Sequence, residues 1–306
     1  TNTDWMDEMT QNGFSMDHSI YLSGGNDRTK YYVSGSYMDQ QGSLRGSEMK
    51  RYNTRMNLTS KINNIFDFGV NMSIGYSNSK TSDPSTGEGR YSWANPWFTG
   101  LLAYPYESPE DWINGDNPTL ILKYFDRDRK LFRMVGTAYL NARITDWLRF
   151  RTSYGIDYYN RKTTGIIMDV AAPAEFALGA YKDNIGAMRN QGVEISLAYA
   201  KQLNKDWGIN VGANFAYNKN KILDLGEGTE YINSGNRRNA VGHQYNNFYM
   251  YKATGKFFNS QEEADEFTAK YGNPFGRKFM AGDIIYEDTN NDGWINKGEL
   301  NGEIGV

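Results

Sequence analysis

Residues 66–77 read FDFGVNMSIGYS, a stretch in which apolar residues alternate with small or polar ones. One face of an extended chain would carry Phe66, Phe68, Val70, Met72, Ile74 and Tyr76. The other face would carry Asp67, Gly69, Asn71, Ser73, Gly75 and Ser77. Successive side chains of a β-strand point to opposite faces, so this period of two predicts a long strand with one apolar face.

The same alternation returns twice further along the chain. The apolar set is Leu148, Phe150, Tyr154, Ile156 and Tyr158 in one copy, and Trp207, Ile209, Val211, Ala213, Phe215 and Tyr217 in the other. Short polar turns precede the three strands within KINNIF (61–66), RITDWL (143–148) and KQLNKDW (201–207). A fourth, shorter pair covers residues 18–22 and 31–38, with its turn at 23–28. Together these patterns predict about eight long strands joined as hairpins.

The connections between these strands alternate between short and long. Long segments cover residues 80–129, residues 160–189 and the chain after 220, and all seven prolines lie in them (84, 96, 105, 109, 118, 173 and 274). Proline cannot donate to a strand ladder, so its absence from the strands is expected. One rim of tight turns and one of long loops predicts an all-β, antiparallel up-and-down transmembrane β-barrel with long extracellular loops. A soluble β-sandwich, which also buries one face of each strand, remains the alternative.

Composition excludes several other classes. Hydrophobic residues make up 39% of the 306 residues, mean hydropathy is −0.71, and no run of eighteen apolar residues occurs, which excludes transmembrane helices. Cysteine is absent, so neither disulfides nor thiolate metal sites are expected, and a net charge of −3 gives no support for nucleic-acid binding. Residues 1–10 lack a secretory signal, and we expect an internal piece of a longer chain.

Four segments resemble the SusC/RagA branch of TonB-dependent transporters of Bacteroidetes outer membranes, and they occur in the family's order. They are residues 3–42 (TDWMDEMTQNGFSMDHSIYLSGGNDRTKYYVSGSYMDQQG), 50–58 (KRYNTRMNL), 184–197 (NIGAMRNQGVEISL) and 282–296 (GDIIYEDTNNDGWIN). The resemblance implies a barrel in the bacterial outer membrane, in contact with its lipid, that imports glycans or oligopeptides. It also implies a SusD-like surface lipoprotein as partner, and energy from the TonB system through a plug domain.

The chain departs from this family pattern in three places. Nothing in it resembles the plug domain, the family's further strands are missing between Met168 and Ala171, and the chain stops at Val306 before an aromatic-ended last strand. We therefore expect a partial barrel with an apparent sequence gap near 168–171. Residues 1–219 are predicted to form barrel strands and loops, and residues 220–306 an extracellular loop region.

Residues 288–299 (DTNNDGWINKGE) match the spacing of an EF-hand calcium loop. Hard oxygen donors recur at alternate positions and a glycine permits the sharp turn. The predicted ligands are Asp288, Asn290, Asp292, the Trp294 carbonyl, Asn296 and Glu299. An Asn/Asp-rich turn that satisfies only its own backbone is the alternative. Bound Ca²⁺ is expected to be weak, with a dissociation constant of about 10⁻⁴–10⁻³ M.

The segment 80–129 is rich in aromatic residues among Gly, Pro, Asp and Asn. Flat aromatic rings beside amide and carboxylate groups suit sugar rings. The candidate ligand-binding residues are Tyr91, Trp93, Trp97, Tyr104 and Trp112, with Tyr106 in the same loop. The competing interpretation is a loop whose aromatics pack on one another.

No constellation for catalysis stands out. The only histidines, His18 and His243, are far apart in sequence, and neither a GxSxG motif nor a phosphate-binding loop occurs. Residues 260–263 (SQEE) form a capping box that predicts one short helix to about residue 270. Its Glu262 and Glu263 are expected on a solvated face. We therefore predict a non-enzymatic importer. The alternatives are a soluble all-β carbohydrate-binding module with a calcium loop and, more remotely, a glycoside hydrolase.

Overall fold

The computed structural model describes residues 2–81, 96–109, 117–124, 126–145, 148–170, 181–204, 206–226, 228–273, 275–289, 291, 293–295 and 300–301. It contains two compact units, residues 1–226 and residues 227–306. Among the described residues, no helix is both long and apolar enough to cross a bilayer.

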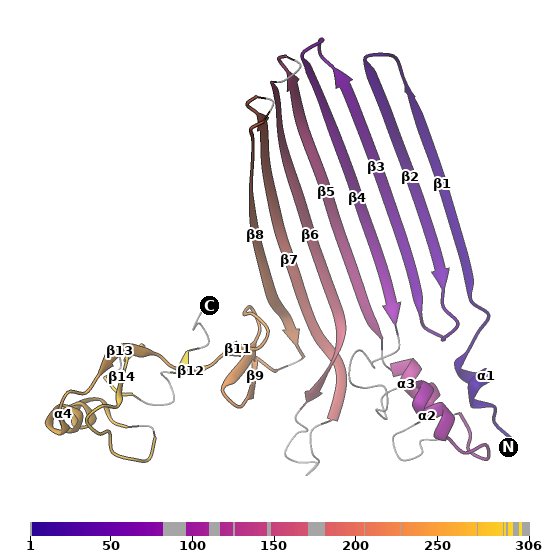
Figure 1. Ribbon diagram of the computed structural model, residues 1–306. Coiled ribbons are helices and arrows are strands. Elements are labelled where there is room, and N and C mark those ends of the chain that lie inside the picture. Colours follow the sequence, from indigo (N-terminus) through magenta and orange to yellow (C-terminus); the bar gives the residue numbers. More distant parts are fainter. Residues whose placement is uncertain are drawn as a thin grey trace. The chain divides into compact units, whose positions relative to one another are not determined.

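The first unit is built on eight strands that pair only with their sequence neighbours, in the order β1 to β8 (Figure 1). Every pairing is antiparallel. The strands are β1 (Phe14–Gly25), β2 (Thr29–Gln41), β3 (Glu48–Lys61), β4 (Phe66–Thr81), β5 (Arg127–Arg143), β6 (Arg149–Val170), β7 (Tyr181–Gln202) and β8 (Gly208–Leu225). This confirms the predicted all-β antiparallel meander of about eight long strands. The sheet is open in the structure, with β1 and β8 as its edges.

Two strands are longer than predicted. β6 and β7 are paired from Val170 and Tyr181 down to Phe150 and Lys201, so the ends of the segment 160–189 are strand and not loop. Polar residues such as Lys162 and Arg189 interrupt the apolar alternation there, which hid the strand. The apparent sequence gap near 168–171 falls at the end of β6, and residues 171–180 lie outside the described residues.

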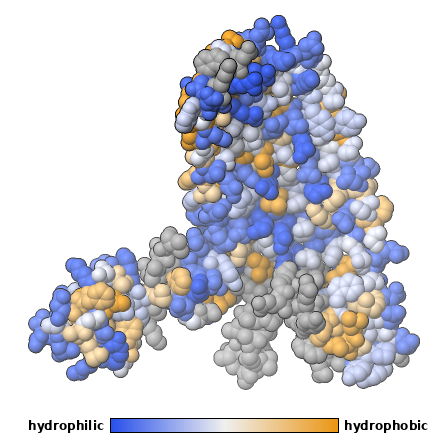
Figure 2. Space-filling model, viewed as in Figure 1, coloured by the Kyte–Doolittle hydropathy of each residue, from blue (hydrophilic) through white to orange (hydrophobic). Residues whose placement is uncertain are grey.

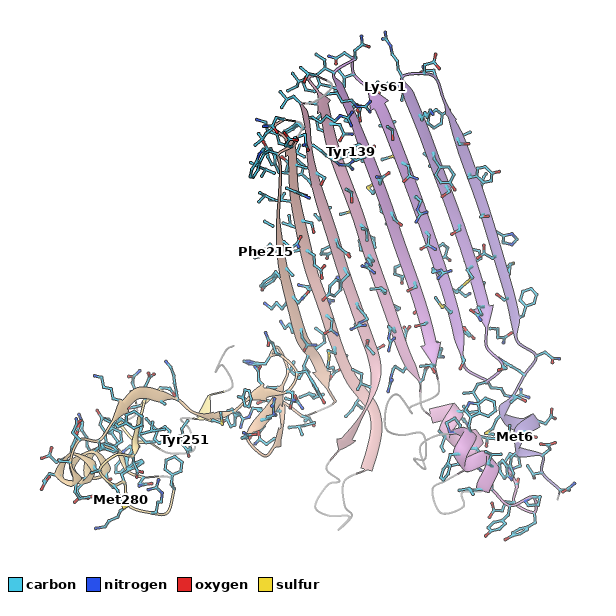
Figure 3. The ribbon with its side chains drawn as sticks, in the orientation of Figure 1. Met6, Lys61, Tyr139, Phe215, Tyr251 and Met280 are labelled. Atoms are coloured by element: carbon cyan, nitrogen blue, oxygen red, sulfur yellow. The ribbon has the colours of Figure 1, made fainter. Side chains whose placement is uncertain are left out.

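The register gives the sheet two chemically different faces. Directly opposite residues share a face, and the pairs Leu58–Val70, Met56–Met72 and Tyr199–Val211 join apolar residues of neighbouring strands. We call this the apolar face; it carries Ile20, Leu22, Val33, Leu58, Val70, Met72, Ile74, Ala138, Ile156, Ile195, Leu197, Val211 and Phe215. Figure 3 shows Phe215 at the β8 edge, projecting away from the strands.

Nothing in the described structure packs against the apolar face. Ile20 is 77% exposed, Phe215 59% and Val211 58%. Among the strand residues whose side chains the structure describes, the buried hydrophobic ones are Ala142, Ile222 and Leu225, all near strand ends. Phe66, Ile74 and Val211 therefore do not meet across a dry centre, as they would in a sandwich.

Aromatic rows border the apolar face near both strand ends. Toward the long connections the rings of Tyr37 and Tyr52 lie 4.9 Å apart and those of Tyr52 and Tyr76 6.4 Å apart, in a row that continues to Phe132 in register. Toward the tight turns the rings of Phe150 and Tyr199 are 5.1 Å apart, and Phe66 is in the same row as Phe150 through Ala142. The residues between these rows are mainly aliphatic.

The tight turns share one hydrogen-bonding device. Asn63 Oδ1 accepts from Ile65 N and Phe66 N, both at 2.8 Å. Asn26 and Asn204 repeat the arrangement in the turns before β2 and β8, and in the turn before β6 Thr145 Oγ1 accepts from Leu148 N. These Asx and ST turns close each hairpin without help from the rest of the chain.

Three short helices pack together beyond the other strand ends (Figure 1). They are α1 (Trp5–Met9), α2 (Pro96–Leu102) and α3 (Pro118–Tyr124). Met9, Thr99 and Ile121 are buried between them, and hydrophobic residues gather in this region in Figure 2, whereas hydrophilic residues cover much of the visible strand surface. The described parts of the segment 80–129 therefore share a small core with α1.

The second unit contains one helix and short strands. The strands are β9 (Tyr231–Ser234), β10 (Arg237–Ala240), β11 (Asn247–Phe248), β12 (Met250–Tyr251), β13 (Ala253–Phe257), β14 (Ile284–Tyr286) and β15 (Leu300–Asn301). The predicted short helix is α4 (Gln261–Tyr271), where Ser260 Oγ accepts from Glu263 N at 3.2 Å and Glu263 Oε2 accepts from Asn259 N at 2.7 Å. Phe258, Ala264 and Phe279 form the buried core of this second unit.

Candidate functional site: the polar face of the strands

The face opposite the apolar one is lined by small, amide and charged side chains. It is generated by the same alternation, because each residue between two apolar ones points to the other side. We call it the polar face; it carries Arg51, Asn53, Arg55, Asp67, Asn71, Ser73, Arg133, Thr137, Asn141, Arg151, Asp157, Asn190, Glu194, Ser196, Asn214 and Asn218. A continuous hydrophilic wall of this kind suits contact with water and polar solutes.

Tyrosines lie over glycines on this wall. A Cβ atom on Gly69 would collide with the ring of Tyr139, and one on Gly192 would come within 2.8 Å of the ring of Tyr159. The Tyr159 hydroxyl donates to Asn218 Oδ1 at 2.9 Å. Because the two glycines have no side chain, both tyrosine rings can lie close to the sheet, and they project less far from the polar face.

Charges on the wall are partly paired. Arg133 donates to both carboxylate oxygens of Asp157, with an Nε–Oδ1 distance of 3.1 Å. The Arg133 side chain is 58% exposed and that of Asp157 20% exposed, so water screens the pair and its contribution to stability is small. The pair mainly fixes geometry, since two parallel hydrogen bonds hold the Arg133 and Asp157 side chains in one relative orientation.

A hollow of about 270 Å³ lies beside this ion pair. Its polar lining includes Arg51, Asn53, Ser73, Ser77 and Arg133. The Nε atom of Arg51 is buried and has no hydrogen-bond partner among the described residues, while its Nη2 lies 3.6 Å from Met38 Sδ. An unsatisfied buried donor is uncommon, so a polar solute or water is the expected partner here.

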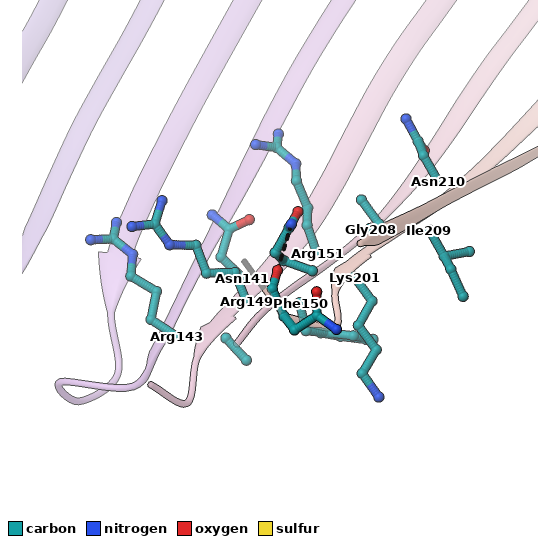
Figure 4. Close-up of a pocket in the computed structure, with 13 residues that line it drawn as sticks. Asn141, Arg143, Arg149, Phe150, Arg151, Lys201, Gly208, Ile209 and Asn210 are labelled. Carbon is teal, nitrogen blue, oxygen red and sulfur yellow. Dashed lines mark hydrogen bonds between the residues drawn. The ribbon is translucent and has the colours of Figure 1, made fainter. Parts of the chain in front are cut away.

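A larger hollow, of about 1150 Å³, lies at the tight-turn end of β5 to β8 (Figure 4). Its lining includes four cationic residues and no acidic one, within the described part of the chain: Arg143, Arg149, Arg151 and Lys201. Figure 4 shows the three arginines extending to one side of the strands and Lys201 extending away from them. Asn141, Gln202, Asn204 and Asn210 supply amide groups in the same lining.

The predicted aromatic ligand residues are only partly within the described structure. Trp97 lies on α2 and is half-buried, while Tyr104 is 58% exposed and stacks on Tyr106 with ring centroids 5.3 Å apart. Trp5 Nε1 donates to the Tyr104 carbonyl at 2.9 Å, which fixes that backbone. Tyr91, Trp93 and Trp112 lie outside the described residues. The Tyr104–Tyr106 pair is thus a flat exposed surface on an anchored loop.

The described part of the predicted calcium loop fits an oxygen-ligand site. Asp288 Oδ2 accepts from Gly293 N at 2.9 Å, and its Oδ1 is buried without a hydrogen-bond partner among the described residues. Gly293 has φ +84° and Asn291 φ +59°, as the sharp turn of such a loop requires. Four of the other predicted ligands lie outside the described residues: Asn290, Asp292, Asn296 and Glu299. Trp294, the remaining one, is 57% exposed.

A metal centre of another kind is not found in the part of the chain that the structure describes, which holds no group of three or more His, Cys, Asp and Glu side chains able to bind an ion.

The polar face itself was missed as a site in the sequence. The polar residues that alternate with the apolar ones in each strand already indicated such a face. The hollows could not be predicted, because they depend on which residues of neighbouring strands lie side by side.

Comparisons with known proteins point to membrane proteins. A family model described as type IX secretion system membrane protein PorP/SprF matches residues 137–290, just over half of the chain. TonB-dependent receptor P3 of Formosa agariphila is 28% identical over 171 residues, which is 52% of this chain and 17% of that protein. TonB-dependent receptor SusC of Bacteroides thetaiotaomicron is 28% identical over 175 residues, or 53% of this chain and 15% of that protein. The matched regions therefore span less than a fifth of these relatives.

Among solved structures, the RagAB peptide importer in its open-open state aligns with 72% of this chain and 31% of the matched chain. The sequence identity is 17% and the TM-score 0.44. A second structure, of the RagAB peptide transporter, aligns with 83% of this chain and 56% of its own at 16% identity, with a TM-score of 0.34.

Proposed function

The chain belongs to the PorP/SprF family of membrane proteins, whose model matches residues 137–290, and we propose that it forms part of the barrel wall of an outer-membrane nutrient importer. It is also homologous to SusC-type TonB-dependent receptors over about half its length. It is a protein of the bacterial outer membrane. The observation that carries the proposal is the exposed apolar face bordered by aromatic rows.

The dimensions of this face match a bilayer. Ten residues separate Phe66 from Tyr76, which is roughly 33 Å along a strand. With the usual strand tilt of about 40°, the apolar band is roughly 25 Å tall, the height found in outer-membrane barrels with aromatic girdles. In water, so large an exposed apolar surface would drive association, whereas lipid covers it without cost. A soluble carbohydrate-binding module is therefore disfavoured.

In this role the polar face lines the aqueous interior. Ser and Asn side chains offer hydrogen bonds to a hydrated solute, and glycines between them leave the passage wide. We propose glycans or oligopeptides as cargo, taken over from a SusD-like lipoprotein at the long-connection side and moved with energy from TonB through a plug domain. Trp97 and Tyr104 are the described candidates for stacking on a sugar ring. No catalytic step is assigned to the chain.

The proposal is tested in a strain that lacks the gene. Uptake of fluorescently labelled glycans and oligopeptides of graded length is compared with the parent and with a complemented strain. We expect loss of one cargo class, restored by the complementing gene, and recovery of the protein in the detergent-extracted outer-membrane fraction. Unchanged uptake of every cargo would contradict the importer.

The PorP/SprF match supports a second candidate, a membrane component of a type IX secretion system. The same deletion strain distinguishes the two. If this candidate is right, nutrient uptake stays intact while the amount of secreted protein in the culture medium falls.

We also propose that residues 288–299 bind Ca²⁺ and stiffen the second unit. Trp294 occupies the loop position whose carbonyl would be a ligand, so its indole should sensitise terbium luminescence from a bound ion. Calcium should displace terbium with an apparent constant of about 10⁻⁴–10⁻³ M. Asp288→Asn should abolish the signal, whereas Glu266→Gln, which removes an exposed carboxylate on α4, should leave it unchanged. Equal signals from both variants would exclude the site.

A further inference from the structure

Three arginines crowd together on the polar face at the tight-turn end of β5 and β6. Arg143 and Arg149 are directly opposite one another in the antiparallel register, and Arg151 is the next residue of β6 on the same face. Like charges directly opposite on neighbouring strands destabilise a sheet. We call Arg143, Arg149 and Arg151 the tight-turn arginine cluster; its arrangement is unfavourable unless an anion offsets the repulsion.

Among the described neighbours, Asp67 pairs with Arg143 and supplies compensating charge to that member of the cluster. Asp67 is the carboxylate of this part of the wall; Asn141 Nδ2 donates to it at 2.6 Å, and Arg143 Nη2 lies 3.7 Å from it. The Arg151 guanidinium lies 4.7 Å from the centre of the Tyr139 ring, which orients it but leaves its charge. Arg149 is exposed and has no ion pair or hydrogen bond to any other described residue.

The space in front of the cluster is open and rich in donors. The hollow of about 1150 Å³ is lined by the three arginines together with the amides of Asn141 and Asn210. Asp206 follows in the turn before β8, where its N–H is bonded to Asn204, and it does not line the hollow. Asp146, in the turn between the two opposed arginines, lies outside the described residues.

We propose that the tight-turn arginine cluster is a binding subsite for a multiply charged anionic group, a phosphate or a set of carboxylates, on a solute inside the barrel. Guanidinium groups present planar forks that match the oxygens of both groups. Membrane lipid is not the source, because the cluster lies on the face opposite the apolar band. The subsite rests on the proposed function in one respect, that the polar face lines an aqueous interior, and it assigns anionic groups to the cargo.

The test is calorimetric titration of the full-length protein in detergent, at low salt, with pyrophosphate in one arm and citrate in the other. Arg149→Gln should weaken binding roughly tenfold, the loss expected from one charge-assisted contact. Arg149→Lys should retain most of it. The matched control is Arg161→Gln, which removes an exposed arginine on the same strand and face, outside the lining of the hollow, and should leave binding unchanged.

Each outcome decides the proposal. Binding of one anion alone identifies phosphate or carboxylate as the preferred group, and binding of both identifies charge as the basis; either supports the subsite when Arg149→Gln weakens it and Arg161→Gln does not. No binding of either anion, or equal losses in the two glutamine variants, overturns it. A heat-modifiable band on electrophoresis verifies that each variant is folded. Intact anion binding without any cargo uptake by cells would count against the importer while leaving the subsite standing.

Discussion

At the level of single residues, the polar face is shaped by tyrosines that lie over glycines. Tyr139 covers Gly69 on the neighbouring strand and at the same time carries the Arg151 guanidinium on its ring. Glycine at position 69 leaves room for this ring, because a Cβ atom there would collide with it. The arrangement couples a backbone position in β4 to the orientation of a cation in β6.

We predict that Gly69→Ala destabilises the protein by about 1 kcal/mol, because the added methyl group displaces Tyr139 from the sheet. Gly212→Ala is the matched control, since a Cβ there would make only an ordinary 3.6 Å contact with the Leu197 carbonyl oxygen. Urea unfolding in detergent micelles measures both. Adding Tyr139→Ala should remove the difference between the two alanine variants, and a difference that persists would exclude this explanation.

In the second unit, the Arg277 guanidinium lowers the pKa of the Asp283 carboxyl below its usual value, and the Met280 N–H, bonded at 2.9 Å, acts in the same direction. A carboxyl whose pKa is depressed in the folded state contributes stability above its unfolded pKa and loses it as pH falls through the folded one. We predict that Arg277→Gln raises the pKa of Asp283, measured from its carboxyl carbon shift. The same measurement in Lys278→Gln should show no change, and equal shifts in both would contradict the role of Arg277.

Much at the residue scale could not be predicted from the sequence. Alternation correctly separated the apolar from the polar set in β4, because that depends only on strand geometry. Which tyrosine covers which glycine, and that Arg143 opposes Arg149, depends on register between segments, which no local pattern carries. The aromatic candidates were chosen by composition, and for Tyr104 the structure adds an anchor that only tertiary contacts provide: its bond from Trp5, 99 positions away.

At the scale of elements, residues within each tight turn determine where the hairpin reverses. In three of the four tight turns one asparagine oxygen accepts from two backbone N–H groups, and in the turn before β6 Thr145 Oγ1 accepts from one, so the reversal is specified locally. This is why the four tight turns could be placed from sequence. The extents of β6 and β7 could not, because their long-connection ends leave the apolar band and lose the alternation that marks a strand in lipid.

We predict that Asn63→Ala costs about 1 kcal/mol of stability, since two N–H groups in the turn lose their acceptor. Asn64→Ala is the control, because Asn64 is the next residue, is exposed and makes no side-chain hydrogen bond in the described structure. Refolding into micelles, followed by the heat-dependent gel shift, measures the difference. If the two variants refold alike, the Asx turn is not what closes this hairpin.

At the scale of the whole molecule, the two faces of the eight strands determine which solvent each side needs. The apolar face has no protein partner among the described residues, and the polar face has charges and hollows that need water. A soluble module and a lipid-embedded wall predict opposite effects on stability when an exposed apolar residue is replaced by a charged one. In water, replacing it by a charge is neutral or favourable; in hydrocarbon the same change is costly.

Phe215 is well placed to show this difference, because it is 59% exposed and in the same row as Met72 and Ile156 in the middle of the band. We predict that Phe215→Arg lowers the stability in lipid by about 2–4 kcal/mol, the cost of an arginine near the bilayer midplane. Asn214→Arg, one residue away on the polar face, should be tolerated, since its side chain enters the aqueous interior. Folding into vesicles of short-chain phosphatidylcholine, monitored by protection from trypsin, compares the two. Equal protection would mean that hydrocarbon does not cover this face, and the importer would have to be abandoned with it.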